Sequence, residues 1–141
     1  MIKQEEVLQK EKIINACRGD GYMEAVRLVS QQEAKGRLQS LNRYVLDENC
    51  SLGKHFYLAE SALLYCVFGS GHMDSNGEKT IFQAGDAAVF KSGEYYSLRN
   101  AEHHEYEQKG RQPLVFVEAI VRDENTSTND AKPMIGICPG K

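Results

Sequence analysis

Short runs of β-branched and aromatic residues, separated by turn-forming residues, dominate the sequence from Tyr22 onward. Gly, Asn, Asp and Ser cluster between the runs, and sustained helical periodicity is almost absent. Many short strands with regular turns are typical of an all-β sandwich or barrel. The expected strands are Met23–Val29, Leu38–Leu46, Lys54–Tyr57, Ala62–Phe68, Lys79–Phe82, Ala87–Phe90, Tyr95–Asn100 and Leu114–Arg122.

Two local motifs support this pattern of strands. Asp74-Ser75-Asn76-Gly77 contains the Asn-Gly pair that closes β-hairpins, because both residues tolerate a positive φ. Ser30-Gln31-Gln32-Glu33 has the form of a capping box and predicts one helical turn before Gly36.

The chain divides into a body and two flanking segments. Residues 1–21 are expected to form an N-terminal arm. The spacing of Val7, Leu8, Ile13 and Ile14 is compatible with a short helix, and an extended segment laid over the body would fit as well. Residues 22–122 form the β-barrel. Residues 123–141 form a C-terminal tail whose apolar patch, Met134 to Cys138, is expected to pack on the barrel or on a partner.

Length and charge exclude several classes of protein. With 141 residues the chain is one domain's worth of sequence. A net charge of −3 and a pI near 5.8 do not favour binding to the phosphate backbone of nucleic acid. No apolar run approaches the roughly 20 residues of a membrane helix. The charged start of the sequence lacks the apolar core of a signal peptide, so we expect no membrane partner and a cytoplasmic location.

The four cysteines are scattered along the chain, with no Cys-x-x-Cys pair. Disulfides are rare in the cytoplasm, so the sequence predicts reduced, buried thiols at Cys17, Cys50, Cys66 and Cys138.

Two segments of the sequence resemble the paired motifs of the cupin superfamily. The first motif spans Ser51-Leu52-Gly53-Lys54-His55-Phe56-Tyr57 and Leu63 to Gly71, and the second spans Gly85-Asp86 to Asn100. The Asn-Gly hairpin lies between them, where the family places its inter-motif turn. The resemblance covers residues 22 to 122 and implies a cupin-type double-stranded β-helix, a jelly-roll barrel that holds a small molecule.

The sequence departs from the cupin pattern at the positions of the metal ligands. His55 matches the first histidine of the family, but Tyr57 stands at the second histidine, Ala62 at the glutamate and Tyr96 at the last histidine. Side chains alternate along a strand, so these positions are expected to face the interior. Cys66 shares the parity of Ala62 and is expected to face the same cavity.

Tyrosine is a poor replacement for histidine as a metal ligand. A phenol has a pKa near 10, so ionising it at pH 7 costs about 4 kcal/mol before a metal bond forms. Glu60 is a possible substitute ligand, although it is expected on the connection between two strands. We therefore predict no tightly bound metal and no cofactor.

A histidine beside two tyrosines has acid–base chemistry of its own. Metal-free cupins such as the dTDP-sugar epimerases resemble this arrangement, with a histidine base and a tyrosine acid. The resemblance implies catalytic roles for His55, Tyr57 and Tyr96. The side chains expected to contact the substrate are Ala62, Cys66, Phe68 and Leu98.

The sequence leaves three functions open. The chain is a metal-independent isomerase, dehydratase or cyclase acting on a small polar metabolite, a binding or sensor module without turnover, or a metal-dependent oxygenase or lyase with unusual ligands. The tyrosines could also simply fill the barrel. The resemblance further implies a homodimer.

Overall fold

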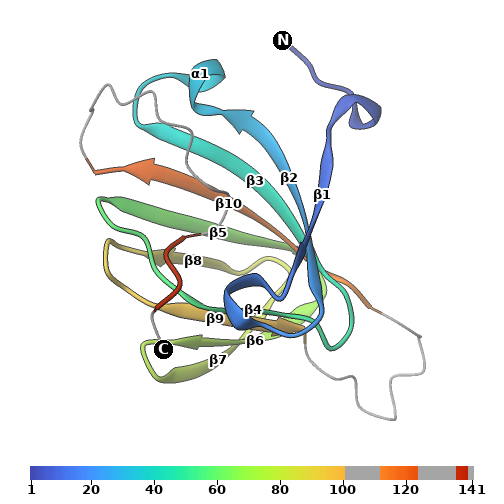
Figure 1. Ribbon diagram of the computed structural model, residues 1–141, viewed down its shortest axis with the longest axis vertical. Helices are drawn as coiled ribbons and strands as arrows, with labels where there is room; N and C mark the ends of the chain where they lie inside the picture. The colour runs from blue at the N-terminus through green and yellow to red at the C-terminus, as the bar shows by residue number, and fades with distance from the viewer. Residues whose placement is uncertain (101–111, 124–135, 140–141) are drawn as a thin grey trace.

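The computed structural model describes residues 1–100, 112–123 and 136–139, and it consists of two facing antiparallel sheets (Figure 1). The larger sheet has the strand order β1-β2-β3-β10-β5-β8, and the smaller has the order β4-β9-β6-β7. The strands are β1 (Lys10–Ile14), β2 (Tyr22–Ser30), β3 (Leu38–Leu46), β4 (Ser51–His55), β5 (Glu60–Phe68), β6 (Ser70–Ser75), β7 (Glu78–Gln83), β8 (Ala87–Phe90), β9 (Tyr96–Asn100) and β10 (Leu114–Arg122). This is the all-β, double-stranded β-helix architecture that the sequence predicts.

Most strand predictions are confirmed, and three of them coincide with β3, β8 and β10 at both ends. The prediction for β4 is shifted, because that strand runs from Ser51 to His55 and ends before Tyr57. Two strands were not predicted, β1 and β6. Strand β6 escaped the pattern because Gly71, His72 and Asp74 interrupt its apolar residues, although it forms the Asn-Gly hairpin with β7 in register Ser75↔Glu78.

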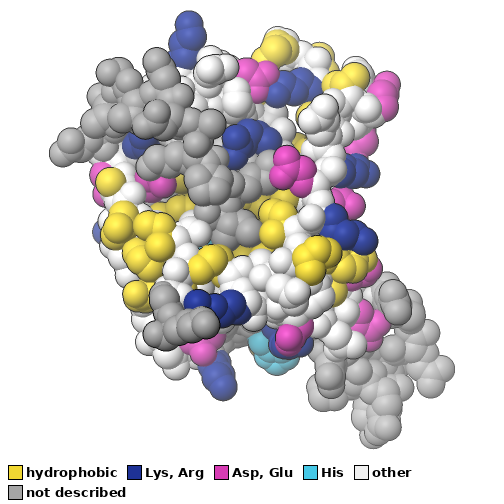
Figure 2. Space-filling view, in the orientation of Figure 1, with side chains coloured by type: hydrophobic (Ala, Val, Ile, Leu, Met, Phe, Trp, Pro, Cys, Tyr) yellow, Lys and Arg dark blue, Asp and Glu magenta, His cyan; other side chains and the backbone are white. Residues whose placement is uncertain are grey.

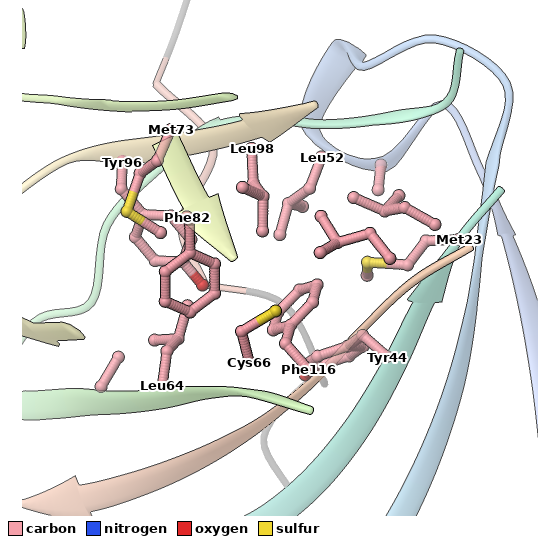
Figure 3. Close-up of a cluster of buried hydrophobic side chains, with 14 of the residues drawn as sticks. Met23, Tyr44, Leu52, Leu64, Cys66, Met73, Phe82, Tyr96, Leu98 and Phe116 are labelled. Carbon is pink, nitrogen blue, oxygen red and sulfur yellow. The ribbon is translucent and has the colours of Figure 1, made fainter. Parts of the chain in front are cut away.

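The core lies between the two sheets, where alternate side chains of each strand point inward. In β10 the alternation holds over the whole strand, with Leu114, Phe116, Glu118, Ile120 and Arg122 buried. Figure 3 shows buried side chains from both sheets pointing into the shared interior, among them Met23, Tyr44 and Cys66. One apolar layer thus holds both sheets together.

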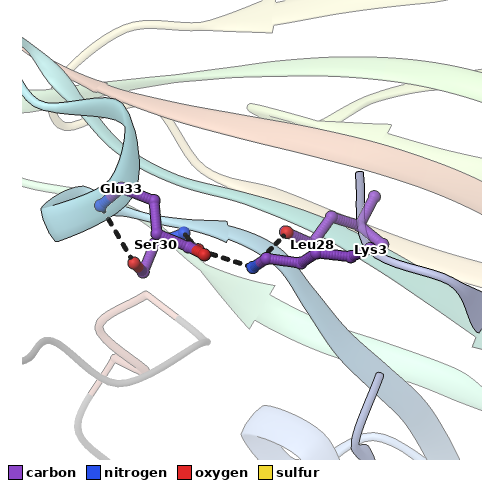
Figure 4. Close-up of polar contacts among 4 residues, drawn as sticks. All are labelled: Lys3, Leu28, Ser30 and Glu33. Carbon is purple, nitrogen blue, oxygen red and sulfur yellow. Dashed lines mark hydrogen bonds and ion pairs between the residues drawn. The ribbon is translucent and has the colours of Figure 1, made fainter. Parts of the chain in front are cut away.

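The N-terminal arm is mainly extended. A 3-10 helix, η1 (Glu5–Val7), precedes β1, and β1 pairs with β2 to form the edge of the larger sheet. The capping box predicted at Ser30 is present at the start of α1 (Gln31–Ala34), and Lys3 forms an ion pair with Glu33 at 2.6 Å (Figure 4). The extended form of the arm is therefore favoured over the helical one because its backbone completes a sheet.

The prediction of four reduced cysteines is wrong for two of them. Cys17 and Cys138 form a disulfide, which joins the 3-10 helix η2 (Ala16–Arg18) to the tail. Cys50 and Cys66 are buried free thiols, as expected. Sequence spacing could not reveal the pair because 121 residues separate the two cysteines.

None of the helices within residues 1–100, 112–123 and 136–139 is long and apolar enough to cross a membrane.

Replacing Gly69, in the turn after β5, is expected to lower the free energy of unfolding strongly. Its φ is +84°, and a Cβ atom there would lie 2.3 Å from the carbonyl oxygen of Pro113. Gly77 is a matched control, because its φ is +87° and a Cβ atom added there would meet no other atom within 4 Å. We expect Gly77→Ala to cost about 1–2 kcal/mol of unfolding free energy, and Gly69→Ala to cost at least about 2 kcal/mol more. Urea unfolding of both variants measures the difference, and equal losses would show that the contact with Pro113 is unimportant.

Candidate functional site

Glu118 is a fully buried carboxylate that accepts hydrogen bonds from three tyrosines. It projects inward from β10 and is 1% exposed. The Tyr96 hydroxyl donates to Oε2 at 2.6 Å, and the hydroxyls of Tyr57 and Tyr44 donate to Oε1 at 3.0 Å and 3.3 Å. A carboxylate has about four acceptor positions, so these hydroxyls satisfy most of them.

The three tyrosines reach this carboxylate from both sheets. Tyr44 lies in β3, beside β10 in the larger sheet, whereas Tyr96 lies in β9 of the smaller sheet. Tyr57 follows the end of β4. All three side chains are at most 7% exposed. The cluster therefore forms only when the two sheets pack face to face.

Burial decides the protonation of the cluster. Loss of water raises the pKa of Glu118 from 4.5 to about 7, against the opposing effect of the three hydroxyls, and the charge of Glu60 raises it further. Burial and then the charge of Glu118 raise the pKa of each tyrosine well above 10. At neutral pH the tyrosines are therefore protonated donors, and the carboxyl of Glu118 keeps its proton to a higher pH than an exposed glutamate does.

His55 lies beside this cluster with one ring nitrogen available. Its Nδ1 lies 2.8 Å from the carbonyl oxygen of Gly53. A carbonyl can only accept, so Nδ1 carries the proton and Nε2 holds a lone pair. Nε2 is buried and has no hydrogen-bond partner among the described residues. Burial lowers the pKa of His55 to about 4, so the ring is neutral at pH 7.

Aromatic contacts hold the imidazole against the tyrosines. The ring centroids of His55 and Tyr96 are 4.2 Å apart, and those of His55 and Tyr57 are 5.8 Å apart, both with edge-to-face geometry. The ring of Tyr96 is in turn stacked on that of Phe90, with centroids 4.4 Å apart. His55 also pairs with Tyr96 in the register of β4 and β9. The structure thus brings the three predicted catalytic residues together.

The predicted substrate-contacting residues divide into two groups. Ala62, Cys66 and Leu98 are buried, at 0%, 0% and 1% exposure. Phe68 is 48% exposed, so the expectation that it lines the interior is not met. The register of β5 against β10 shifts between Cys66 and Phe68, and this irregularity turns Phe68 outward.

Glu60 is also placed differently from the sequence-based expectation. It is the first residue of β5 rather than part of the connection between strands, and it is 5% exposed. It lies opposite Arg122 in the register of β5 and β10, and it is near enough to Glu118 to raise the pKa of that carboxyl.

The sequence-based analysis missed Glu118 and Tyr44. The sequence does indicate that both side chains point inward. Glu118 alternates in step with the apolar residues Phe116 and Ile120 along its strand, and Tyr44 does so with Leu46. A charged residue at an inward position of an otherwise apolar strand indicates a buried polar site.

The side chains at the cupin ligand positions do not fit a divalent metal. Tyr57 and Tyr96 use their hydroxyls to bind Glu118, and the raised pKa of each disfavours a phenolate ligand. Ala62 has no donor atom, which leaves the single imidazole of His55. Among the described residues, no group of three or more His, Cys, Asp or Glu side chains is arranged to hold a metal ion.

Solved structures with this fold include several cupins. The chain resembles a protein from Thermotoga maritima described as a predicted oxalate decarboxylase, with a TM-score of 0.77 and 25% identity over 86% of this chain and 99% of that chain. It also resembles an RmlC-like cupin from Shewanella frigidimarina, with a TM-score of 0.65 and 13% identity over 86% and 89% of the two chains. The polyketide cyclase RemF from Streptomyces resistomycificus has a TM-score of 0.66 and 16% identity over 93% and 90%.

No protein-family model and no curated protein matches the sequence. The two-sheet architecture and the solved neighbours nevertheless agree with the motif resemblance. The chain therefore has the cupin-type double-stranded β-helix fold. At three of the four positions where the motif resemblance places metal ligands, it carries tyrosine, alanine and tyrosine.

Glu118 and His55 are expected to affect stability in opposite directions as the pH changes. The raised pKa of Glu118 means that its contribution is full below pH 4.5 and is lost as the pH rises through about 7. The lowered pKa of His55 means that its contribution is full above pH 6.5 and is lost as the pH falls through about 4. Between pH 4.5 and 6.5 the two effects oppose each other.

Replacing Glu118 should therefore expose the effect of His55. We expect the unfolding free energy of Glu118→Gln to rise by about 2 kcal/mol more than that of the wild type between pH 4.5 and 6.5. Urea unfolding across this range provides the measurement, and the exposed Glu78→Gln is the matched control. Parallel pH curves for the wild type and Glu118→Gln would contradict the raised pKa.

Proposed function

We propose that this cupin binds a small polar metabolite in its barrel and transforms it by metal-independent acid–base chemistry, as an isomerase, dehydratase or cyclase. The observation that carries the proposal is the buried Nε2 lone pair of His55, which has no partner among the described residues. A buried acceptor left without a donor is costly, so a donor supplied by a ligand would stabilise this site.

In this mechanism His55 accepts a proton from the substrate. The bond to Gly53 fixes the tautomer and directs the basic nitrogen Nε2 away from the backbone. The pKa of about 4 makes His55 a weak base in the closed site. Charge that develops on the substrate next to the imidazole would increase this basicity as the proton moves.

The second proton transfer is assigned to the tyrosines and Glu118. When Glu118 is protonated, its O–H can donate to a tyrosine oxygen, and that tyrosine hydroxyl is released to donate to a substrate carbonyl. Tyr96, with its 2.6 Å contact to Glu118, and Tyr57 are the candidates. A carboxyl group with a pKa of about 7 is well matched to proton transfer at neutral pH.

A binding or sensor role is the second candidate. Its support is the near-complete burial of the site, since His55 and Tyr96 are at most 1% exposed. A closed polar cluster can hold a ligand without turnover, or it can stabilise the barrel as a structural element. The solved neighbours have different activities, so the fold alone does not select between these roles.

Solvent deuterium exchange provides a test that does not require the product to be known. Chelator-treated protein in D₂O is incubated with a panel of ketoses and β-diketones, and mass spectrometry measures deuterium at the carbon next to the carbonyl. We expect protein-dependent exchange that falls at least about 100-fold in His55→Ala and declines as the pH rises through about 7. Deuterium exchange that requires added metal, or that persists in His55→Ala, would contradict the mechanism.

A homodimer is the proposed assembly, formed through the outer face of β5 and β8. Outward side chains there are apolar and about half exposed, namely Leu63, Tyr65, Val67, Phe68 and Val89. Leu63 and Val89 are register partners, so the patch is continuous across the two strands. Contiguous apolar patches of this kind often mark interfaces.

A second copy of the chain suits this patch because the five side chains are uncharged and can meet their own symmetry mates without repulsion. Charged side chains elsewhere are mixed, and on the face shown in Figure 2 basic and acidic groups are interspersed. Strand β8 also ends the larger sheet, so the patch extends to a sheet edge.

The mass in solution tests this assembly. Light scattering is expected to give twice 15.9 kDa for the wild type and the monomer mass for Leu63→Glu/Val89→Glu. Ile81→Glu changes a 58% exposed residue of β7 in the other sheet, and it should leave the dimer intact. A wild-type protein that remains monomeric at high concentration would refute the assignment.

A further inference from the structure

The C-terminal residues Gly136–Pro139, here called the strap (red in Figure 1), lie directly against the candidate site. Ile137 forms an isolated β-bridge with Phe56, in which Phe56 N donates to Ile137 O at 3.0 Å and Ile137 N donates to Phe56 O at 2.7 Å. Phe56 lies between His55 and Tyr57 in the sequence. The strap is therefore attached at the segment that carries two of the proposed catalytic side chains.

Gly136 brings the strap into contact with a site tyrosine. A Cβ atom at Gly136 would lie 2.5 Å from the carbonyl oxygen of Phe56 and 3.0 Å from Cε1 of Tyr57. Only glycine allows so close an approach. Tyr57 is 7% exposed with the strap in this position. The strap thus covers one side of the ring whose hydroxyl binds Glu118.

The Cys17–Cys138 disulfide ties the strap to the segment around Cys17. This segment packs on β4, the strand that ends at His55. A Cβ atom at Gly53 of β4 would lie 1.8 Å from the carbonyl oxygen of Cys17, and one at Gly19 would lie 2.1 Å from that of Ser51. Cys17 itself has a φ of +46°. This left-handed conformation is unfavourable for cysteine, so tight packing on β4 must maintain it.

The disulfide is consequently the strongest described link between the strap and the barrel. The strap also makes the two backbone hydrogen bonds of the bridge and the close contact of Gly136. Two backbone hydrogen bonds contribute little after the conformational entropy of ordering a short segment is subtracted. Cys138 is exposed, so a reductant in solution can reach it.

We propose that the Cys17–Cys138 disulfide is a reducible modification site that controls whether the strap covers Tyr57, the ring beside His55 in the candidate site. A dithiol reductant transfers two electrons and two protons to the disulfide, producing the thiols of Cys17 and Cys138 and a cyclic oxidised dithiol. The released strap then leaves the Phe56 bridge, and the candidate site opens on this side. The consequence for substrate access rests on the proposed function, whereas the release of the strap does not.

Hydrogen exchange on the full chain tests the release. After treatment with dithiothreitol, amide exchange at Phe56 and Ile137 is expected to rise at least about tenfold, because the bridge opens locally. The amide of Cys66, which donates to Asp86 O, serves as an internal control and should not change. Cys138→Ser should exchange rapidly with and without reductant, whereas Cys50→Ser should respond as the wild type does.

Two results would overturn the release. One is unchanged protection of Phe56 after complete reduction. The other is the alkylation of four rather than two thiols in denatured protein prepared without reductant, since only Cys50 and Cys66 are free in the oxidised form.

Histidine modification tests the opening of the site separately from turnover. Diethyl pyrocarbonate should modify His55 at least about five times faster in reduced than in oxidised protein, since burial limits the reaction in the closed form. The exposed His72 of β6 should react equally in both forms. Faster exchange at Phe56 with unchanged modification of His55 would show that the strap moves without opening the site. Turnover is not needed for either measurement, so these failures are distinguishable from failure of the proposed chemistry.

Discussion

The interior of this barrel depends on one buried carboxylate that receives three hydrogen bonds. Desolvating Glu118 is unfavourable, and the hydroxyls of Tyr44, Tyr57 and Tyr96 offset part of that cost. Because the donors come from both sheets, the carboxylate links the two layers at a point where apolar packing alone would not specify their relative position. The result is a polar cluster within an otherwise apolar core, and its geometry is set by the packing of the sheets.

This cluster occupies the region where the cupin motifs would place metal ligands. Two ligand positions hold tyrosines that donate to Glu118, and a third holds alanine. A site organised around a metal requires donors of lone pairs, whereas this one combines phenol hydrogens with a carboxylate. The substitutions are therefore coherent when Glu118 is included, because each tyrosine supplies a hydrogen-bond donor to the same group.

Two segments that lie outside the two cupin motifs in sequence meet near the same strand. The segment around Cys17 packs on β4, and the strap pairs with Phe56 just beyond the end of that strand. The disulfide connects them. Segments that flank the barrel in sequence thus become neighbours of His55 and Tyr57, and the environment of the site depends on residues far from the two cupin motifs.

Local sequence patterns determined the strands, the Asn-Gly hairpin and the capping box at Ser30, because each depends on alternation or turn chemistry within a few residues. The motifs also predicted that His55, Tyr57 and Tyr96 lie together. Phe68 was misplaced because a register shift, which depends on pairing with β10, reversed its direction.

Tertiary structure alone decided the rest. The carboxylate partner of the tyrosines, the shifted pKa values of Glu118 and His55, and the Cys17–Cys138 link all depend on segments distant in sequence. Alternation along β10 indicates that Glu118 points inward, but only the packing of the two sheets specifies which hydroxyls it meets and how little water remains around it. Burial and long-range contact are properties of the folded chain, and they set the chemistry of this site.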